Sequence, residues 1–222
     1  MDPFINDLIV YWPQLLTGLE RTLILMVIVS LTGLAGGVGV FYLTLVKNSI
    51  LHKWTEAYIS FFIGTPLLVH LFLMYYGLPQ LGIRLSALTV AVIGFTLNVS
   101  AYNARYLATA YNGLDKEELE AARAQGFKHS ETFRLIILPQ VMRLSVPSLT
   151  NQVIQNLKDT SVAFLIQYHD LFAQIQEIAS SNFHFFKAYM TAALVYLALV
   201  SIVVLAARRF ERFISLPGFE TH

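Results

Sequence analysis

The sequence contains no cysteine and few charged residues. Without cysteine, the chain has no disulfides, thiolate nucleophiles or cysteine-based metal sites. Charged residues make up 13% of the 222 residues, against about 25% in soluble domains. The net charge is +1, and no basic stripe with interleaved aromatic residues occurs, which argues against nucleic-acid binding.

Apolar residues dominate the composition instead. They account for 56% of the chain, including 16 phenylalanines, and the mean hydropathy is +0.59. Too little polar sequence remains to cover a soluble globule with such a core, so we expect lipid around most of the chain. The first residues, Met1 to Phe4, lack the basic region and cleavage site of a secretory signal, so we expect the N-terminus to be retained.

Long uncharged runs predict the membrane spans. A helix needs about 20 apolar residues to cross a bilayer core, and the runs predict an all-α integral membrane protein with five transmembrane helices in a single domain, 1–222. The expected spans lie at about 19–46, 55–76, 86–111, 136–166 and 187–208. Gly64-Thr65-Pro66 interrupts the second span. The fourth carries Asp159, Pro139 and Pro147, so we expect it to be kinked and partly polar.

Loop charges predict the orientation, because basic residues are held on the cytoplasmic side. A cytoplasmic C-terminus places ten basic residues in or next to the cytoplasm: Lys47, Lys53, Lys116, Arg123, Lys128, Arg134, Arg143, Arg208, Arg209 and Arg212. Only three then lie outside: Arg21, Arg84 and Lys187. We therefore predict an external N-terminus, a cytoplasmic C-terminus and a long cytoplasmic loop from Gly113 to about Arg134.

The cytoplasmic loop contains a short helical pattern. Asp115 is expected to cap this helix, with Glu118 as its capping-box partner. Gly126 stands where a helix-ending glycine occurs. The pattern predicts a short helix at about 116–126, and a second helix that starts at Ser130 and leads into the fourth span. Taken alone, such a loop could be a solvated connector.

Motifs in this loop resemble those of a known family. Glu120-Ala121-Ala122, Gly126 four residues later and Ile136-Ile137-Leu138-Pro139 resemble the signature loop of the permease subunits of ATP-binding-cassette importers. Further segments look like the polar amino-acid uptake branch of that family: Phe62–Val69, Asn98 with Ala101-Tyr102, and Leu157–Ser161. The likeness covers about residues 17–212, which is nearly the whole chain.

The resemblance implies a multi-pass subunit of the bacterial inner membrane that moves a polar L-amino acid into the cytoplasm and is not itself an enzyme. It implies a second permease copy or a paralogue, a dimer of cytoplasmic ATPases and an extracytoplasmic solute-binding protein. No cofactor is expected in this chain, since ATP and magnesium would be on the partner ATPase. The residues implied in coupling to that ATPase are Glu118, Glu120, Ala121, Ala122 and Gly126.

Nucleotide and metal motifs are absent from the sequence. The glycine cluster at 33–39 lies in an apolar span with no following Lys-Ser/Thr, so it is not a phosphate loop. Gly33 and Gly37 are spaced for close helix packing instead. His70 is expected to be a hydrogen-bonded core residue, and no histidine has a second one at metal-ligand spacing.

Polar residues follow one face of the third and fourth spans. Two sets have helical spacing: Asn98, Tyr102 and Arg105, and Asn151, Gln155 and Asp159. Amides there could line a path or bond across helices, and both interpretations stay open for Asn151, Gln152 and Asn156. An intramembrane carboxylate is a functional-site hypothesis by default. Asp159 could thus meet a substrate ammonium, or form an ion pair with Lys158 or Arg105.

The resemblance also implies a substrate site near the broken second span and the end of the fourth. Its residues, carried over position by position, are Thr65, Asn98, Tyr102, Asp159, Thr160 and Ser161. Ile63 replaces the arginine usual in these relatives, and Arg105 stands where many have an acidic or amide residue. These departures weaken the case for a guanidinium or lysine substrate. The amino acid carried stays open, with a slight inclination to cystine.

Two other functional classes compete with a transporter. An integral-membrane enzyme built on Asp159 or a histidine would need a second carboxylate, a Ser/His pair or a metal set on the same face, and the pattern has none. An assembly protein with no transport path would not need the polar faces of the third and fourth spans. Tyr168–Ser181 has helical spacing and could be an outer helix that contacts a binding protein, a gate or a connector.

Overall fold

The computed structural model describes residues 3–46 and 48–214, and these residues are almost entirely helical. No strand occurs within those ranges, which confirms the predicted all-α class. Lys47, one of the basic residues used to predict the orientation, lies outside the described residues, as do residues 1–2 and 215–222.

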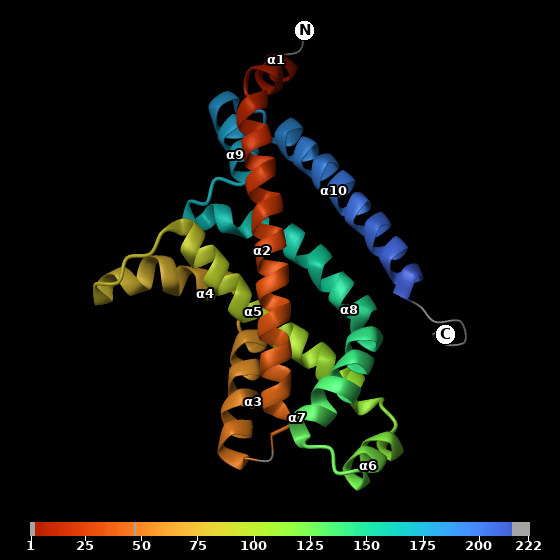
Figure 1. Cartoon of the computed structure of the whole chain (residues 1–222). Coiled ribbons are helices and arrows are strands. Elements are labelled where there is room, and N and C mark those ends of the chain that lie inside the picture. Colours follow the sequence, from red (N-terminus) through yellow and green to blue (C-terminus); the bar gives the residue numbers. More distant parts are fainter. Residues whose placement is uncertain (1–2, 47, 215–222) are drawn as a thin grey trace.

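Long helices form the body of the molecule. They are α2 (Trp12–Thr44), α3 (Ser49–Gly64), α5 (Ala87–Asn112), α8 (Leu138–Asp159) and α10 (Phe185–Ile214). The shorter α-helices are α1 (Pro3–Val10), α4 (Leu67–Phe72), α6 (Lys116–Ala124), α7 (His129–Thr132) and α9 (Leu171–Asn182). Four turns are π-helical or 3-10 helical: η1 (Leu73–Gly77), η2 (Leu78–Leu81), η3 (Phe133–Ile137) and η4 (Thr160–Ile166). In Figure 1, α2 runs through the centre, with α6 and α7 at one end and α1 and α9 at the other.

Helices α2 and α5 make the most extensive contact between elements. A Cβ atom at Gly33 would lie 2.5 Å from Cγ1 of Val99, and one at Gly37 would lie 2.5 Å from Cβ of Asn103. Both separations are far shorter than van der Waals contact, so these helices approach at the distance that glycine permits. The predicted role of Gly33 and Gly37 in close packing is confirmed.

We expect Gly37→Ala to destabilise the protein by about 1–3 kcal/mol, because the added methyl group forces α2 away from the backbone of α5. Gly39 lies two residues further along α2 and faces open space. Gly39→Ala should therefore keep or raise the stability, by up to about 1 kcal/mol, through better helix propensity. Thermal unfolding of both variants in the same detergent checks this expectation. Equal melting temperatures would show that the close approach contributes nothing.

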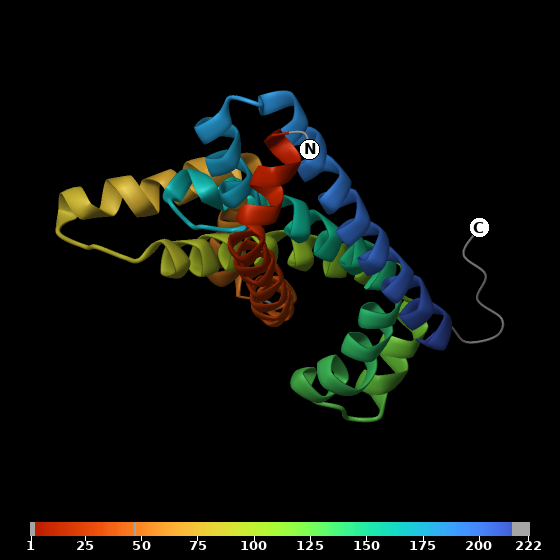
Figure 2. The ribbon, with the colours of Figure 1, turned by 90° about the horizontal axis from the view of Figure 1, so that it is seen from above.

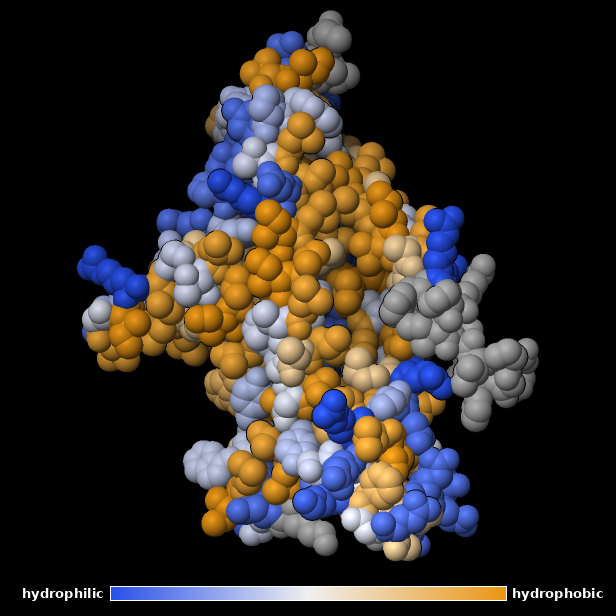
Figure 3. Space-filling view, viewed as in Figure 1, coloured by the Kyte–Doolittle hydropathy of each residue, from blue (hydrophilic) through white to orange (hydrophobic). Residues whose placement is uncertain are grey.

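Three helices are long and apolar enough to cross a membrane: Trp12–Thr44, Ala87–Asn112 and Phe185–Arg209. The bent pair Ser49–Gly64 and Leu67–Leu81 gives a fourth if it forms one span. Among the described helices, α8 does not qualify, since polar and charged residues occupy much of it, and the count of five is therefore not confirmed. Figure 3 shows a broad apolar surface over α2 and α10, with polar residues gathered towards the two ends.

The helix boundaries differ from the predicted spans at α2 and α10. α2 begins at Trp12 rather than near residue 19, and it includes the charged Glu20 and Arg21. α10 likewise continues past Arg208 to Ile214. The hydropathy pattern locates an apolar segment, whereas backbone hydrogen bonding decides where the helix begins and ends.

The expected fourth span, 136–166, is not one α-helix. Pro139 lies in the first turn of α8, directly after the π-helical turn η3, and Pro147 lies inside α8. The π-helical turn η3 precedes α8, and the 3-10 helix η4 replaces α-helix after Asp159. The last seven residues of the expected span, Thr160–Ile166, are thus a tighter 3-10 helix.

The second predicted span breaks as expected, but its halves do not continue in one direction. α3 and the α4–η2 segment meet at 101°. Thr65 is extended, with φ −122° and ψ 143°, and Pro66 begins the next helix. A residue before proline avoids the helical region, which explains the break. Figures 1 and 2 both show the α4–η2 segment projecting from the bundle as an arm.

Hydrogen bonds at the first turn of α9 join it to α2 and α10. Asp170 caps it, since its Oδ1 accepts a hydrogen bond from the N–H of Ala173 (2.9 Å). The N–H of Leu171 donates to Oγ1 of Thr22 on α2 (3.0 Å), and the hydroxyl of Tyr196 on α10 donates to Oδ2 of Asp170 (3.3 Å). Burial raises the pKa of Asp170 to about 6, because a carboxylate loses hydration there.

The apolar face of α9 packs inward: Leu171, Ile175 and Ile178. That face is therefore not a surface for a binding protein.

Candidate functional site

The break between α3 and α4 is stabilised by side chains that cap the end of α3. The last carbonyls of a helix have no partner within it. The Thr65 hydroxyl donates to the carbonyl of Phe61 (2.6 Å), and Nδ2 of Asn98 on α5 donates to the carbonyl of Phe62 (2.9 Å). Thr65 and Asn98, both predicted site residues, therefore stabilise the break by satisfying these carbonyl groups. Irregular backbone is tolerated in a membrane where it is buried in protein or lines a cavity.

A cavity of about 600 Å³ lies beside this break. Residues from α3, the break, α4, α5 and α8 line it: Ile63, Gly64, Thr65, Pro66, Leu67, Asn98, Tyr102, Tyr106, Asn151, Gln152, Gln155 and Asp159. Its volume falls in the range of small-molecule sites, about 300–1,000 Å³. The structure therefore brings the second, third and fourth predicted spans together around one polar cavity.

Asp159 is the acidic residue of this cavity. Its Oδ1 accepts a hydrogen bond of 2.7 Å from Nε2 of Gln155, one turn earlier on α8. Arg105, a candidate partner in the sequence, instead donates to Oε2 of Glu56 on α3 at 3.2 Å. Among the described residues, Asp159 forms no ion pair. Lys158, the other candidate partner, is not within ion-pair distance, although its charge acts on this carboxylate. A carboxylate outside an ion pair can bind a cationic group.

The predicted substrate residues do not all reach the cavity. Thr65, Asn98, Tyr102 and Asp159 line it, and Thr160 and Ser161 do not. The Thr160 hydroxyl is buried and donates to the carbonyl of Leu157 (2.8 Å), and the Ser161 hydroxyl donates to the carbonyl of Lys158 (2.8 Å). Both hydroxyls cap the end of α8 in the first turn of η4. Their role here is local, because the change from α to 3-10 helix turns them back onto the backbone.

Tyr106 lines the cavity and was missed in the sequence. It follows Asn98 and Tyr102 at i+8 and i+4, so the same helical spacing could have identified it. The pattern selected Arg105 instead, and that side chain points to Glu56. A one-residue difference rotates a side chain by about 100° around a helix, and the charge of Arg105 made it the more conspicuous of the two.

The sequence left open whether the amides of α8 line a path or bond to other helices, and the structure shows both. Nε2 of Gln152 donates to Oδ1 of Asn156 (2.9 Å), and Nδ2 of Asn156 donates to the Ser30 hydroxyl on α2 (3.0 Å). Asn156 therefore bonds across helices. Asn151 and Gln152 line the cavity, where Gln152 also completes the buried chain of hydrogen bonds.

The short helix of the cytoplasmic loop forms where it was predicted. α6 spans Lys116–Ala124, and Oδ1 of Asp115 accepts the N–H of Glu117 at 2.9 Å, as a cap does. Gly126 has φ +85°, the left-handed conformation expected of a helix-ending glycine. Glu118 does not return to the cap. It accepts a 2.7 Å hydrogen bond from Nε2 of Gln140 at the start of α8.

The signature residues of α6 face in different directions. Glu120 and Ala121 are exposed, whereas Ala122 is 5% exposed and Leu119 is 7% exposed. Leu119 packs in a cluster with α2, α5 and η3. The following helix, α7, begins at His129, one residue before the predicted Ser130. One face of α6 is therefore fixed to the bundle and the other is open to a partner.

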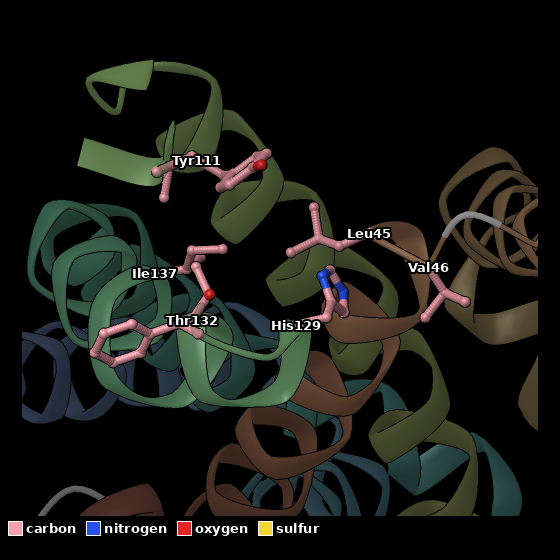
Figure 4. Close-up of a pocket in the computed structure, with 8 residues that line it drawn as sticks. Leu45, Val46, Tyr111, His129, Thr132 and Ile137 are labelled. Atoms are coloured by element: carbon pink, nitrogen blue, oxygen red, sulfur yellow. The ribbon is translucent and has the colours of Figure 1, made fainter. Parts of the chain in front are cut away.

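A second, mostly apolar cavity of about 460 Å³ lies between α6 and the ends of α2 and α5. Figure 4 shows Leu45 and Val46 on one side, with Tyr111, Thr132 and Ile137 across from them and His129 between. Its wall is built from the elements that anchor α6. No group of three or more histidine or acidic side chains is placed for a metal anywhere in the described parts of the chain.

Comparison with known proteins gives a family match across most of the chain. Residues 32–215 match the family described as binding-protein-dependent transport system inner membrane component. The probable amino-acid permease protein YxeN of Bacillus subtilis is 39% identical over 209 residues, 93% of each chain. The probable amino-acid ABC transporter permease protein PatM of Vibrio harveyi is 42% identical over 160 residues, 71% of this chain and 72% of that protein. The L-cystine transport system permease protein TcyB of Bacillus subtilis is 33% identical over 212 residues, 92% of this chain and 90% of that protein.

Solved structures share the fold. A chain from the crystal structure of an amino acid ABC transporter with histidines superimposes with a TM-score of 0.86 at 30% identity, covering 96% of this chain and 99% of that one. A chain of the inward-facing MetNI methionine ABC transporter superimposes with a TM-score of 0.79 at 20% identity, covering 93% and 98%. At that lower identity, the second likeness concerns the fold alone.

Proposed function

This chain belongs to the family of inner membrane components of binding-protein-dependent transport systems, and we propose that it is the permease subunit through which a polar L-amino acid enters the cytoplasm. As a member of that family it is a multi-pass inner membrane protein and an amino-acid ABC transporter permease. The observation that carries the proposal is the polar cavity at the broken span, with the unpaired carboxylate of Asp159 in its wall.

In the proposed arrangement the chain is one transmembrane domain with five spans. α2, the bent α3–α4 pair, α5, α8 and α10 cross the membrane, with the N-terminus outside and the C-terminus in the cytoplasm. α8 is too polar to face lipid over its whole length, so it crosses beside the cavity and against α2, α5 and α10, which it contacts. α6 and α7 then lie on the cytoplasmic side.

The substrate site in this proposal consists of Thr65, Asn98, Tyr102 and Asp159, joined by Tyr106 and Gln155. Asp159 binds the substrate ammonium, while the amides and tyrosine hydroxyls bind polar groups of the ligand. Thr160 and Ser161 shape the end of α8 rather than contact the ligand. The names of the relatives extend to L-cystine, glutamine and arginine systems, so they leave the particular amino acid open.

The proposed partners follow from the family. The chain pairs with a second permease copy or a paralogue, receives substrate from an extracytoplasmic binding protein and docks two cytoplasmic ATPases. It is not itself an enzyme and holds no cofactor, because ATP and magnesium bind the ATPases. The exposed Glu120 and Ala121 of α6 contact the ATPase, and the Glu118–Gln140 hydrogen bond passes the movement of α6 to α8, which lines the cavity.

The test is purification of the tagged chain from its native membrane in mild detergent, followed by identification of bound proteins. ATP hydrolysis is then measured with the standard L-amino acids and L-cystine, each with the co-purified binding protein. We expect an ATPase to co-purify and one amino acid to raise its rate. A chain that purifies alone and supports no stimulated hydrolysis would contradict the proposal.

A further inference from the structure

His70 lies behind the wall of the polar cavity, on the α4 side of the broken span. Its side chain is buried, with 4% of the residue exposed, and it does not line the cavity. The ring packs against Phe61 and Phe62 at centroid distances of 5.2 and 4.8 Å. Nε2 forms a hydrogen bond with the hydroxyl oxygen of Thr65. A buried histidine outside the cavity lining therefore contacts a lining residue.

The hydrogen bonds of Thr65 show which of the two side chains, Thr65 or His70, donates the proton in the bond between them. The hydroxyl has one proton, and it donates that proton to the carbonyl of Phe61 at 2.6 Å. The contact with His70 then requires Nε2–H as the donor and the hydroxyl oxygen as the acceptor. Nδ1 of His70 is buried and has no hydrogen-bond partner among the described residues. A second proton there would have no acceptor, so the ring is the neutral Nε2–H tautomer.

This arrangement ties the two halves of the bent span through one side chain. Thr65 lies in extended backbone between α3 and α4, with Pro66 after it. Its hydroxyl is fixed to the end of α3 through Phe61 and to the first turns of α4 through His70. Asn98 secures the neighbouring carbonyl of Phe62 from α5. The hydroxyl oxygen thus has a fixed position at the cavity wall before any ligand arrives.

We propose that His70 is a positioning residue for the substrate site, which acts through Thr65 and the break in the second span rather than by touching the ligand. This inference rests on the proposed function. Donation from Nε2 holds Thr65 in the rotamer that keeps the α3–α4 break open, so the backbone and hydroxyl at the break are preorganised for the ligand. The apolar surroundings of His70 exclude water that would compete for this hydrogen bond.

Two other roles for His70 fit the contacts less well. As a metal ligand it would need further donors, and no cluster of three or more histidine or acidic groups occurs in the described chain. As a proton carrier it would need an acceptor at Nδ1, which the described residues do not supply. A purely space-filling role is distinguished by experiment, because it does not depend on a donor at the Nε2 position.

The test compares His70→Leu, His70→Gln, Thr65→Val and the double variant His70→Leu with Thr65→Val, in the purified permease–ATPase complex without its binding protein. Equilibrium binding is measured with radiolabelled standard L-amino acids and L-cystine, one at a time. We expect His70→Leu to weaken binding about fivefold, the equivalent of one neutral hydrogen bond. His70→Gln can place an amide N–H near the Nε2 position and should stay within about twofold of wild type. The double variant should bind no more weakly than Thr65→Val alone.

The melting temperature and the amount of co-purified ATPase serve as controls that each variant is folded and assembled. If His70→Leu does not accumulate, His70→Asn takes its place, because its shorter amide does not reach the Thr65 hydroxyl and should bind as weakly as expected for leucine. If the loss of binding in the double variant equals the product of the losses in the two single variants, the positioning role is wrong. Unchanged binding by His70→Leu would also contradict it. Neither result would contradict the proposed function. A wild-type complex that binds none of the probes would overturn the proposed function, and this role with it.

Discussion

Asp159→Asn should weaken amino-acid binding and uptake by about 10- to 100-fold, the largest effect expected at the cavity. The substitution keeps the shape of the side chain and its hydrogen bond with Gln155, and it removes the charge that faces the cavity. A hydrogen bond to a charged group contributes about 1.5–3 kcal/mol. Uptake of radiolabelled amino acids into proteoliposomes, measured against substrate concentration, gives both the half-saturating concentration and the maximal rate.

The matched control for Asp159 is Glu56→Gln. Glu56 is a carboxylate of the same bundle, but it pairs with Arg105 and does not line the cavity. Because the side chains of that pair are partly exposed, we expect its loss to cost little and to leave substrate affinity near wild type. Equal losses in the two variants would mean that charge anywhere in the bundle matters, and normal uptake by Asp159→Asn would remove Asp159 from the substrate site.

Gly126→Val should reduce ATP-driven uptake at least tenfold while the protein stays in the membrane. Gly126 has φ +85°, a conformation that costs a β-branched residue about 1–3 kcal/mol. No atom lies within 4 Å of the position of an added Cβ, so the effect comes from the backbone rather than from a collision. Relief of the strain would change the turn that joins α6 to α7, and with it the orientation of Glu120 and Ala121 towards the ATPase.

Gly126→Asn provides the comparison, since asparagine adopts the left-handed region more readily than other residues with a Cβ. Uptake by this variant should stay close to wild type. The decisive measurements are the membrane level of each variant, the amount of co-purified ATPase and the uptake rate. If the valine variant couples normally, the shape of the turn after α6 is not part of the coupling mechanism.

Local sequence patterns predicted the polar site in part, and the parts that failed share one cause. Helical spacing placed Asn98 and Tyr102 on one face of the third predicted span and Asp159 on one face of the fourth, and all three line the cavity. Arg105, placed on the same face by its spacing, and Thr160, carried over from the resemblance, do not line the cavity. Their positions depend on which neighbouring group the side chain meets, Glu56 for one and a backbone carbonyl for the other. Spacing identifies a face of a helix, but it does not identify the atoms across from it.

The sequence by itself determined those features that depend on residues close together in the chain. Apolar runs located the long helices α2, α5 and α10, Asp115 and Gly126 marked the ends of α6, and Pro66 marked the break in the second span. Hydropathy, capping and proline geometry act within a few residues. Only the tertiary structure decided the cavity between α3, α4, α5 and α8, the pairing of Arg105 with Glu56 and the hydrogen bond from Asn98 to the carbonyl of Phe62. Each of these requires helices from distant parts of the chain to be packed first, since their packing sets which polar groups can meet.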